Sequence, residues 1–275
     1  MKTLIFSATY NEAGNVNKLL EGICAAVPGV DILIVDDGSR DGTVEAMKML
    51  GLSNLTIVQR PEKMGLGTAH LFAFCYAIHH SYDRLVTMDA DGSHEPSSIP
   101  GLLEKIGQGH DFAIGSRYMA GGSCDYDGYR LRVSQAANIA ARLLLGIKLS
   151  EFTTSFRAFR VAKLRMFSFP RLIVGGYSFF LTTVVEAARR GMRLTELPIH
   201  FRERGYGSSK IPSFEIFRGM INLSRLAFIK AFLRRPAVAE QVLSACDACG
   251  NPYSLILMQG SSVVRGTCIH CGVVK

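Results

Sequence analysis

The run LVTMDADG at residues 85–92 decides the fold of this chain. A short apolar segment ends at once in Asp89 and Asp91, which is typical of a buried strand that stops in a polar turn. Alternate residues of an extended chain lie on one face, so both carboxylates can address a single hard cation. Parallel α/β sheets bind their ligands where strands end in this way. The motif alone is equally compatible with an ordinary turn that binds nothing.

Two further apolar runs end in polar residues. Residues 32–35 read ILIV and lead into Asp37, while the run at residues 3–6 leads to Tyr10 and Glu12. Because neighbouring parallel strands end at the same edge of a sheet, we expect these side chains around one cleft. Carboxylates gathered there would repel each other, so a base, a ribose and a metal ion are their natural partners. The sequence therefore predicts an α/β domain that binds a nucleoside diphosphate.

Longer motifs give a resemblance to a known family. They read YNE at 10–12, VDDGSRDGT at 35–43, GLGTA at 65–69, MDAD at 88–91 and GSRY at 115–118. In this order they resemble the family 2 glycosyltransferases, and most of all the polyprenyl-phosphate branch typified by dolichol-phosphate mannose synthase. The resemblance runs from about residue 3 to residue 210. It implies a GT-A catalytic domain, an α/β fold with a Rossmann-like mixed sheet, over residues 1–210.

The resemblance also implies a role for each residue that matches a family motif. The catalytic residues would be Asp89, Asp91 and Arg117, and the first two would hold Mg²⁺ or Mn²⁺. Ser93 is a third candidate metal ligand, with its neighbour His94 as a substitute. The donor nucleotide would be bound by Ala8, Tyr10, Glu12, Val35, Asp37 and Asp89, and the acceptor phosphate by Arg117, Arg130, Ser134 and Arg202. The ordinary alternative for these arginines is a solvated surface position.

These roles predict an inverting, metal-dependent enzyme. It would move one sugar from GDP-mannose or a UDP-sugar to dolichyl or undecaprenyl phosphate. A phosphomonoester with a second pKa of about 6 is already largely dianionic at neutral pH, so this acceptor needs no general base. Two alternatives stay open. One is transfer to a hydroxyl acceptor in polysaccharide or glycolipid assembly, and the other is a non-catalytic nucleotide-binding scaffold.

Several residues depart from the family pattern. Glu151 and Ser155 stand where the motif before Arg157 usually has Asp and Gly. Phe180 and Thr182 replace a Gln and a Glu that usually follow the next glycine motif. These changes would alter the sugar pocket, so the resemblance does not imply mannose. The scaffold alternative rests on the second pair of changes.

Composition favours a protein that meets an anionic partner. The chain has 275 residues and a formal net charge of +8. Nucleic acid, phospholipid headgroups and a phosphorylated lipid all fit this charge. The sequence contains no run of about 18 uncharged apolar residues, and its first residues do not resemble a secretory signal. We therefore expect a cytoplasmic protein without a membrane span. A phosphorylated lipid acceptor would bring it to the cytoplasmic face of the membrane as a peripheral protein.

Residues 211–240 predict an amphipathic helix with basic residues along and after it. Its apolar residues suit a helix lying in the membrane interface, and they equally suit a helix packed on the catalytic domain. The sequence pattern does not distinguish the two.

Residues 241–275 predict a zinc ribbon. Cysteines 246, 249, 268 and 271 have the spacing C-x2-C-x18-C-x2-C, with β-rich segments between the pairs. Four thiolates would close the tetrahedron around Zn²⁺, so the metal would be structural. Disulfides are the alternative, which a reducing compartment and the further cysteines Cys24, Cys75 and Cys124 disfavour. The ribbon is a candidate site for a protein partner, whereas its few basic residues disfavour nucleic acid.

Overall fold

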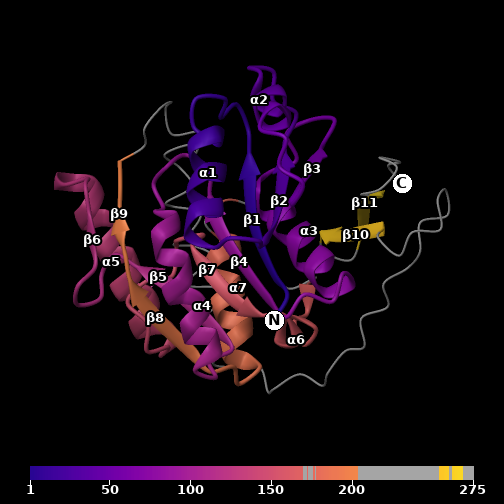
Figure 1. The fold of residues 1–275 in the computed structure, drawn as a ribbon. Helices are drawn as coiled ribbons and strands as arrows, with labels where there is room; N and C mark the ends of the chain where they lie inside the picture. Colours follow the sequence, from indigo (N-terminus) through magenta and orange to yellow (C-terminus); the bar gives the residue numbers. More distant parts are fainter. Residues whose placement is uncertain (170–171, 173–175, 177, 204–253, 260–261, 269–275) are drawn as a thin grey trace.

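A computed structural model describes residues 1–169, 172, 176, 178–203, 254–259 and 262–268; Figure 1 draws the others as a thin grey trace. The predicted helix at residues 211–240 lies outside the described residues. So do Cys246, Cys249 and Cys271 of the predicted zinc ribbon. Among the described residues, no helix combines the length and the apolar character needed to cross a membrane.

The catalytic part is built on a sheet of seven strands in the order β3-β2-β1-β4-β7-β5-β8. Every neighbouring pair is parallel except the two that involve β7, which runs antiparallel to β4 and to β5. The predicted mixed sheet is therefore confirmed. The bounds are β1 Thr3–Thr9, β2 Asp31–Asp36, β3 Leu55–Gln59, β4 Arg84–Asp89, β5 Phe112–Ser116, β7 Arg157–Arg160 and β8 Leu194–Pro198.

The strands alternate cleanly between two buried apolar clusters. In β1, Leu4 and Phe6 face one cluster and Ile5 faces the other, and in β4 Leu85 and Val86 are divided in the same way. This is the two-residue period of an extended chain. Because both faces are buried, the strands read as continuous apolar runs, as central strands of parallel sheets do. Both faces of the sheet must therefore be covered by helices.

Helices supply that cover on both sides of the sheet (Figure 1). The cluster that includes Phe6 contains residues of α3, α5, α6 and α7, and the cluster that includes Ile5 contains residues of α1, α2 and α4. The bounds are α1 Val16–Ala26, α2 Thr43–Met49, α3 Leu66–His79, the 3-10 turn η1 Pro96–Ser98, α4 Ile99–Gly107, α5 Gly128–Leu145, α6 Val161–Leu164 and α7 Ser178–Arg189.

Two small pairs of strands complete the described structure. The strands β6 Ser123–Cys124 and β9 His200–Phe201 run parallel to each other. The strands β10 Ser254–Gln259 and β11 Ser262–Cys268 form an antiparallel hairpin. This hairpin occupies the β-rich segments predicted between the two cysteine pairs, and Cys268 closes it.

Candidate active site

The carboxylates of Asp89 and Asp91 lie where β4 ends. The Asp89 side chain is 30% exposed, whereas Asp91 is 5% exposed. Asp91 Oδ1 accepts a hydrogen bond from the Ser93 N–H at 3.0 Å. Gly92 between them has φ +83°, a conformation that side chains disfavour. The sequence thus brings both carboxylates to the predicted edge of the sheet.

These two carboxylates suit a hard divalent cation, whose remaining positions phosphate oxygens and water can fill. In the described part of the chain, no group of three or more His, Cys, Asp or Glu side chains could hold a metal ion. The hydroxyl of Ser93, the third candidate, is buried and has no hydrogen-bond partner in this part of the chain.

His94 holds the loop after β4 in place. It is 1% exposed, and its Nδ1 accepts a hydrogen bond from the backbone N–H of Asp89 at 3.1 Å. Nδ1 therefore carries no proton, and Nε2–H donates to Thr154 Oγ1 at 3.0 Å. Burial lowers the pKa of His94, which favours this neutral ring. Both ring nitrogens are thus used within the protein, which favours a structural role over metal binding.

The loops after β1 and β2 lock onto each other. The Asn11 N–H donates to Ser39 Oγ at 2.8 Å, and the Glu12 N–H donates to Thr43 Oγ1 at 2.9 Å. Because β1, β2 and β4 are parallel, with Ala8 paired to Asp89 and Thr9 paired to Asp36, these loops leave the sheet at the same edge as Asp89. Lys63 Nζ lies 4.5 Å above the Tyr10 ring. The candidate donor residues Tyr10 and Glu12 therefore share one edge of the sheet with the carboxylates.

Asp37 and Val35 differ from the simple picture of donor contacts. Asp37 is 5% exposed, with Oδ1 3.0 Å from Arg60 Nε and Oδ2 accepting the Gly65 N–H at 2.9 Å. Burial raises the pKa of this carboxyl, against the pull of Arg60. The Val35 side chain is fully buried in the apolar core, so only its backbone can reach a ligand. Ala8 packs against the same core.

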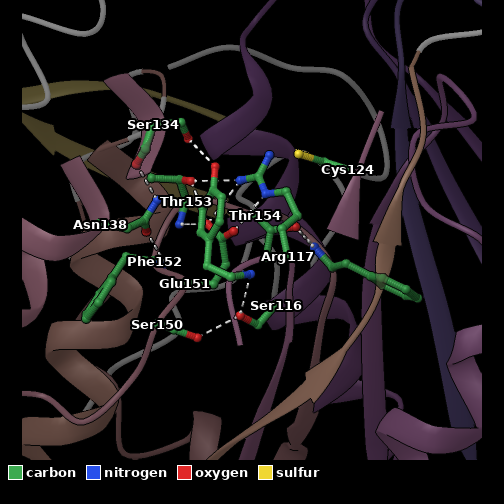
Figure 2. A network of polar contacts seen from close by, with 12 residues as sticks. Ser116, Arg117, Cys124, Ser134, Asn138, Ser150, Glu151, Phe152, Thr153 and Thr154 are labelled. Atoms are coloured by element: carbon green, nitrogen blue, oxygen red, sulfur yellow. Dashed lines mark hydrogen bonds and ion pairs between the residues drawn. The ribbon is translucent and has the colours of Figure 1, made fainter. Parts of the chain in front are cut away.

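Arg117, at the end of β5, is held by a buried glutamate (Figure 2). Its Nε donates to Glu151 Oε2 at 2.8 Å and its Nη2 donates to Oε1 at 3.1 Å, so the pair is bidentate. Glu151 is 0% exposed. Burial opposes both charges, but the ion pair raises the pKa of Arg117 and lowers that of Glu151. Arg117 therefore keeps its positive charge, which is shielded from water and balanced by the Glu151 carboxylate.

A chain of hydroxyls connects Arg117 to α5. Arg117 Nη1 donates to Tyr126 Oη at 2.8 Å, and Tyr126 Oη lies 3.1 Å from Tyr118 Oη. Tyr118 Oη in turn donates to Ser134 Oγ at 2.7 Å. Two of the predicted acceptor residues, Arg117 and Ser134, are thereby brought together. Arg130 also lies in α5, with its side chain outside the described structure.

Arg202, which directly follows β9, contacts the loop after Asp91. The Arg202 N–H donates to the Ser93 carbonyl at 3.0 Å, and Arg202 Nε lies 2.5 Å from Glu95 Oε1. The preceding Phe201 pairs with His94, and its ring lies 4.6 Å from Arg117 Cζ. One short strand therefore links the loop after Asp89 and Asp91 with both arginines. The segment from residue 93 to residue 95, which follows the two carboxylates, is thereby tied to β9 and to Arg202.

Sequence reasoning missed the partners of these residues. Glu151 appeared only as a departure from a motif, and nothing in its spacing links it to Arg117. Glu95 and Tyr126 were not singled out at all. Phe180 and Thr182 are both 3% exposed, so these substitutions contribute to the core rather than to an open surface.

Comparison with known proteins agrees with the resemblance. The family model described as glycosyl transferase family 2 matches residues 5–167. The chain belongs to this family. Polyprenol monophosphomannose synthase of Mycolicibacterium smegmatis is 37% identical over 227 residues, or 81% of this chain and 86% of that protein. Undecaprenyl-phosphate mannosyltransferase of Micrococcus luteus is 35% identical over 228 residues, or 82% of this chain and 93% of that protein. The family 2 protein described here is a glycosyltransferase.

Solved structures agree on the fold. Glucosyl-3-phosphoglycerate synthase from Mycobacterium tuberculosis, in complex with Mn²⁺, UDP and glucosyl-3-phosphoglycerate, matches with a TM-score of 0.59 at 18% identity. The match covers 83% of this chain and 79% of that one. The same enzyme in complex with Mg²⁺ and UDP gives a TM-score of 0.61 at 18% identity, covering 82% and 79%. The predicted GT-A fold is confirmed.

Proposed function

We propose that this family 2 glycosyltransferase moves one sugar from a nucleotide-diphosphate sugar to a polyprenyl phosphate. The names of the two mannosyl-transferring relatives described above support a polyprenyl-phosphate acceptor. The observation that carries the proposal is the junction made by β9, where Arg202 bonds to the loop after Asp91 and Phe201 lies against Arg117. Two anionic reactants can meet there, one beside carboxylates that suit a metal and one beside arginines.

The acceptor phosphate supplies its own nucleophile. As a dianion it carries no proton that must be removed, so the site needs alignment and charge neutralisation rather than a general base. A phosphate oxygen forms the new bond to the anomeric carbon, and the bond from that carbon to the diphosphate breaks. The electron pair leaves with the nucleoside diphosphate. Direct displacement inverts the anomeric centre, so an α-linked donor gives a β-linked lipid product.

We further propose that Asp89 and Asp91 hold Mg²⁺ or Mn²⁺. Such a cation, when bound, would offset the charge that develops on the leaving diphosphate. The pair of carboxylates fits this use because a magnesium-type ion takes its other oxygens from phosphate and water. The structures of glucosyl-3-phosphoglycerate synthase with Mn²⁺ or Mg²⁺ and UDP support the same choice.

The proposal includes peripheral contact with the cytoplasmic face of a membrane. A polyprenyl phosphate resides in the bilayer, and the formal net charge of +8 favours an anionic surface. Residues 211–240 form the proposed interfacial helix between the catalytic domain, residues 1–210, and the ribbon, residues 241–275.

We also propose a structural zinc ion at Cys246, Cys249, Cys268 and Cys271. The β10–β11 hairpin between the two pairs supports this because ribbon sites of this type flank β strands. Purified protein should contain about one zinc per chain, and Cys268→Ser should lower that content severalfold, as measured by elemental analysis. Cys75→Ser, at a buried cysteine in α3, is the matched control and should keep its zinc. Zinc-free wild-type protein would contradict the proposal.

The function can be tested by direct transfer. A panel of radiolabelled GDP- and UDP-sugars is offered with undecaprenyl or dolichyl phosphate in detergent, in the presence of Mg²⁺ or Mn²⁺. Butanol-extractable label from one donor is the expected result, and it also identifies the sugar. A mild-acid-labile, β-configured phosphodiester would support inversion. Label that appears only in hydroxyl acceptors, or in no acceptor although the nucleotide binds, would overturn the proposal.

A further inference from the structure

Both described arginines of the proposed acceptor site are paired with a glutamate, but in opposite settings. Arg117 and Glu151 have side chains 8% and 0% exposed, and their contact is bidentate. Arg202 and Glu95 have side chains 51% and 25% exposed. A pair open to water is weak and exchangeable, whereas a buried bidentate pair fixes the orientation of its arginine. The two glutamates should therefore act differently on a bound phosphate.

Glu151 is itself held on all sides. Its Oε1 accepts hydrogen bonds from the Thr153 N–H at 3.0 Å and the Thr153 hydroxyl at 2.7 Å. Its own N–H donates to Glu196 Oε1 at 3.0 Å, and Glu196 Oε1 also accepts the Ser150 N–H at 2.9 Å. Strand β8, which carries Glu196, thus fixes the backbone from which Glu151 reaches Arg117. Figure 2 shows Glu151 and Thr153 beside Arg117.

The contacts fix the plane of the Arg117 guanidinium. Nε and Nη2 are directed to Glu151, and Nη2 also donates to Thr153 Oγ1 at 3.1 Å. Nη1 is directed to Tyr126, the first hydroxyl of the chain that ends at Ser134. A planar fork fixed at two edges retains one direction in which it can meet a further anion.

We propose that Glu151 is a positioning residue, which orients Arg117 so that its Nη1 edge and the adjoining hydroxyls of Tyr126 and Ser134 meet the acceptor phosphate. The inference rests on the proposed function and adds a residue to it. Glu151 does not touch the acceptor. It acts through Arg117, and its negative charge near the site would by itself repel the acceptor phosphate.

The two possible roles of Glu151, a nearby negative charge and a residue that orients Arg117, predict opposite changes in acceptor binding when Glu151 is replaced. If Glu151 acted only as a negative charge near a dianion, its removal would strengthen acceptor binding. If Glu151 orients Arg117, its removal weakens acceptor binding because the guanidinium loses its fixed plane. Glu95→Gln removes the same charge beside the other arginine, at a pair whose side chains are open to water. It is therefore the matched control for charge alone.

The test compares Glu151→Gln with Glu95→Gln in steady-state transfer by the full-length protein. We expect Glu151→Gln to raise KM for polyprenyl phosphate about tenfold while KM for the nucleotide sugar stays within about twofold. Glu95→Gln should leave the acceptor KM unchanged or lower it. Glu151→Asp, which keeps the charge with a shorter reach, should fall between wild type and Glu151→Gln.

Tyr126→Phe guards against a folding defect in the buried variants. It removes the second contact of the Arg117 fork from a half-buried residue and should raise the acceptor KM about threefold. An unchanged or lower acceptor KM in both Glu151→Gln and Tyr126→Phe would overturn the inference. Equal rises in both substrates' KM would do so too, because they indicate a general structural defect. If wild-type protein transfers nothing to polyprenyl phosphate, the proposed function itself fails, which is a distinct outcome.

Discussion

Replacing Asp91 with Asn is expected to lower kcat/KM for sugar transfer about a thousandfold. A metal ion that neutralises developing charge contributes several kcal/mol, and about 4 kcal/mol corresponds to about three powers of ten in rate. Asn is close to Asp in shape and keeps an oxygen that can accept the Ser93 N–H, whose bond to Asp91 Oδ1 measures 3.0 Å. The substitution therefore removes a charge from the proposed metal site without removing the contact that shapes the loop.

The measurement is initial rate as a function of Mn²⁺ or Mg²⁺ concentration at saturating acceptor. The variant should need a higher metal concentration to reach its reduced maximum. Asp83→Asn is the matched control because Asp83 lies just before β4, at the opposite end of the strand, where its carboxylate accepts the Lys2 N–H. It should stay within about twofold of wild type. Wild-type rates and wild-type metal dependence in Asp91→Asn would remove this carboxylate from the metal site.

The sequence predicts the frame of the fold because its signals are local. The runs at residues 32–35 and 85–88 are too apolar for strands with a solvated face, and polar turns mark where they end. Both are buried central strands. The order of the strands is not local, and the antiparallel β7 between β4 and β5 has no sign in the sequence around residues 157–160. The motifs supplied the mixed sheet through the family resemblance alone.

The site divides in the same way. The positions of Asp89 and Asp91 follow from a strand end, so they are readable from the sequence. The state of Asp37 is not readable because it depends on Arg60, which arrives from the end of β3. Arg117 is likewise buried rather than solvated because it pairs with Glu151, which lies 34 residues away in sequence. Ion pairs between residues far apart in sequence decide which charged side chains can still contact a ligand. A local sequence pattern does not reveal these ion pairs.

Arg157 is also a buried arginine. Its replacement by Met should lower the free energy of unfolding by about 3–5 kcal/mol. The side chain is 1% exposed, and it donates to three main-chain carbonyls: Nε to Thr154 at 2.7 Å, Nη1 to Phe180 at 2.9 Å and Nη2 to Phe152 at 2.8 Å. Burial lowers the pKa of this arginine to about 9, which still leaves it charged at neutral pH. Met fills a similar volume but leaves all three buried carbonyls without this donor, and such groups are costly to leave unsatisfied.

Urea unfolding measures this effect, and Arg160→Met provides the comparison on the same strand. Arg160 lies 3.4 Å from the carboxylate of Asp111, and its Nη2 donates to the Ile106 and His110 carbonyls at 2.8 and 3.3 Å. Because its side chain is 31% exposed, water can replace part of these contacts, and its replacement should cost about 1 kcal/mol. Arg157→Lys keeps a charge but has one nitrogen to offer to three carbonyls, so its stability should lie between wild type and Arg157→Met. Equal unfolding midpoints for Arg157→Met and Arg160→Met would mean that the buried contacts add nothing. The expected difference would instead make Arg157 the tie between the segment that carries Glu151 and helix α7, and so a stabilising support of the acceptor side of the site.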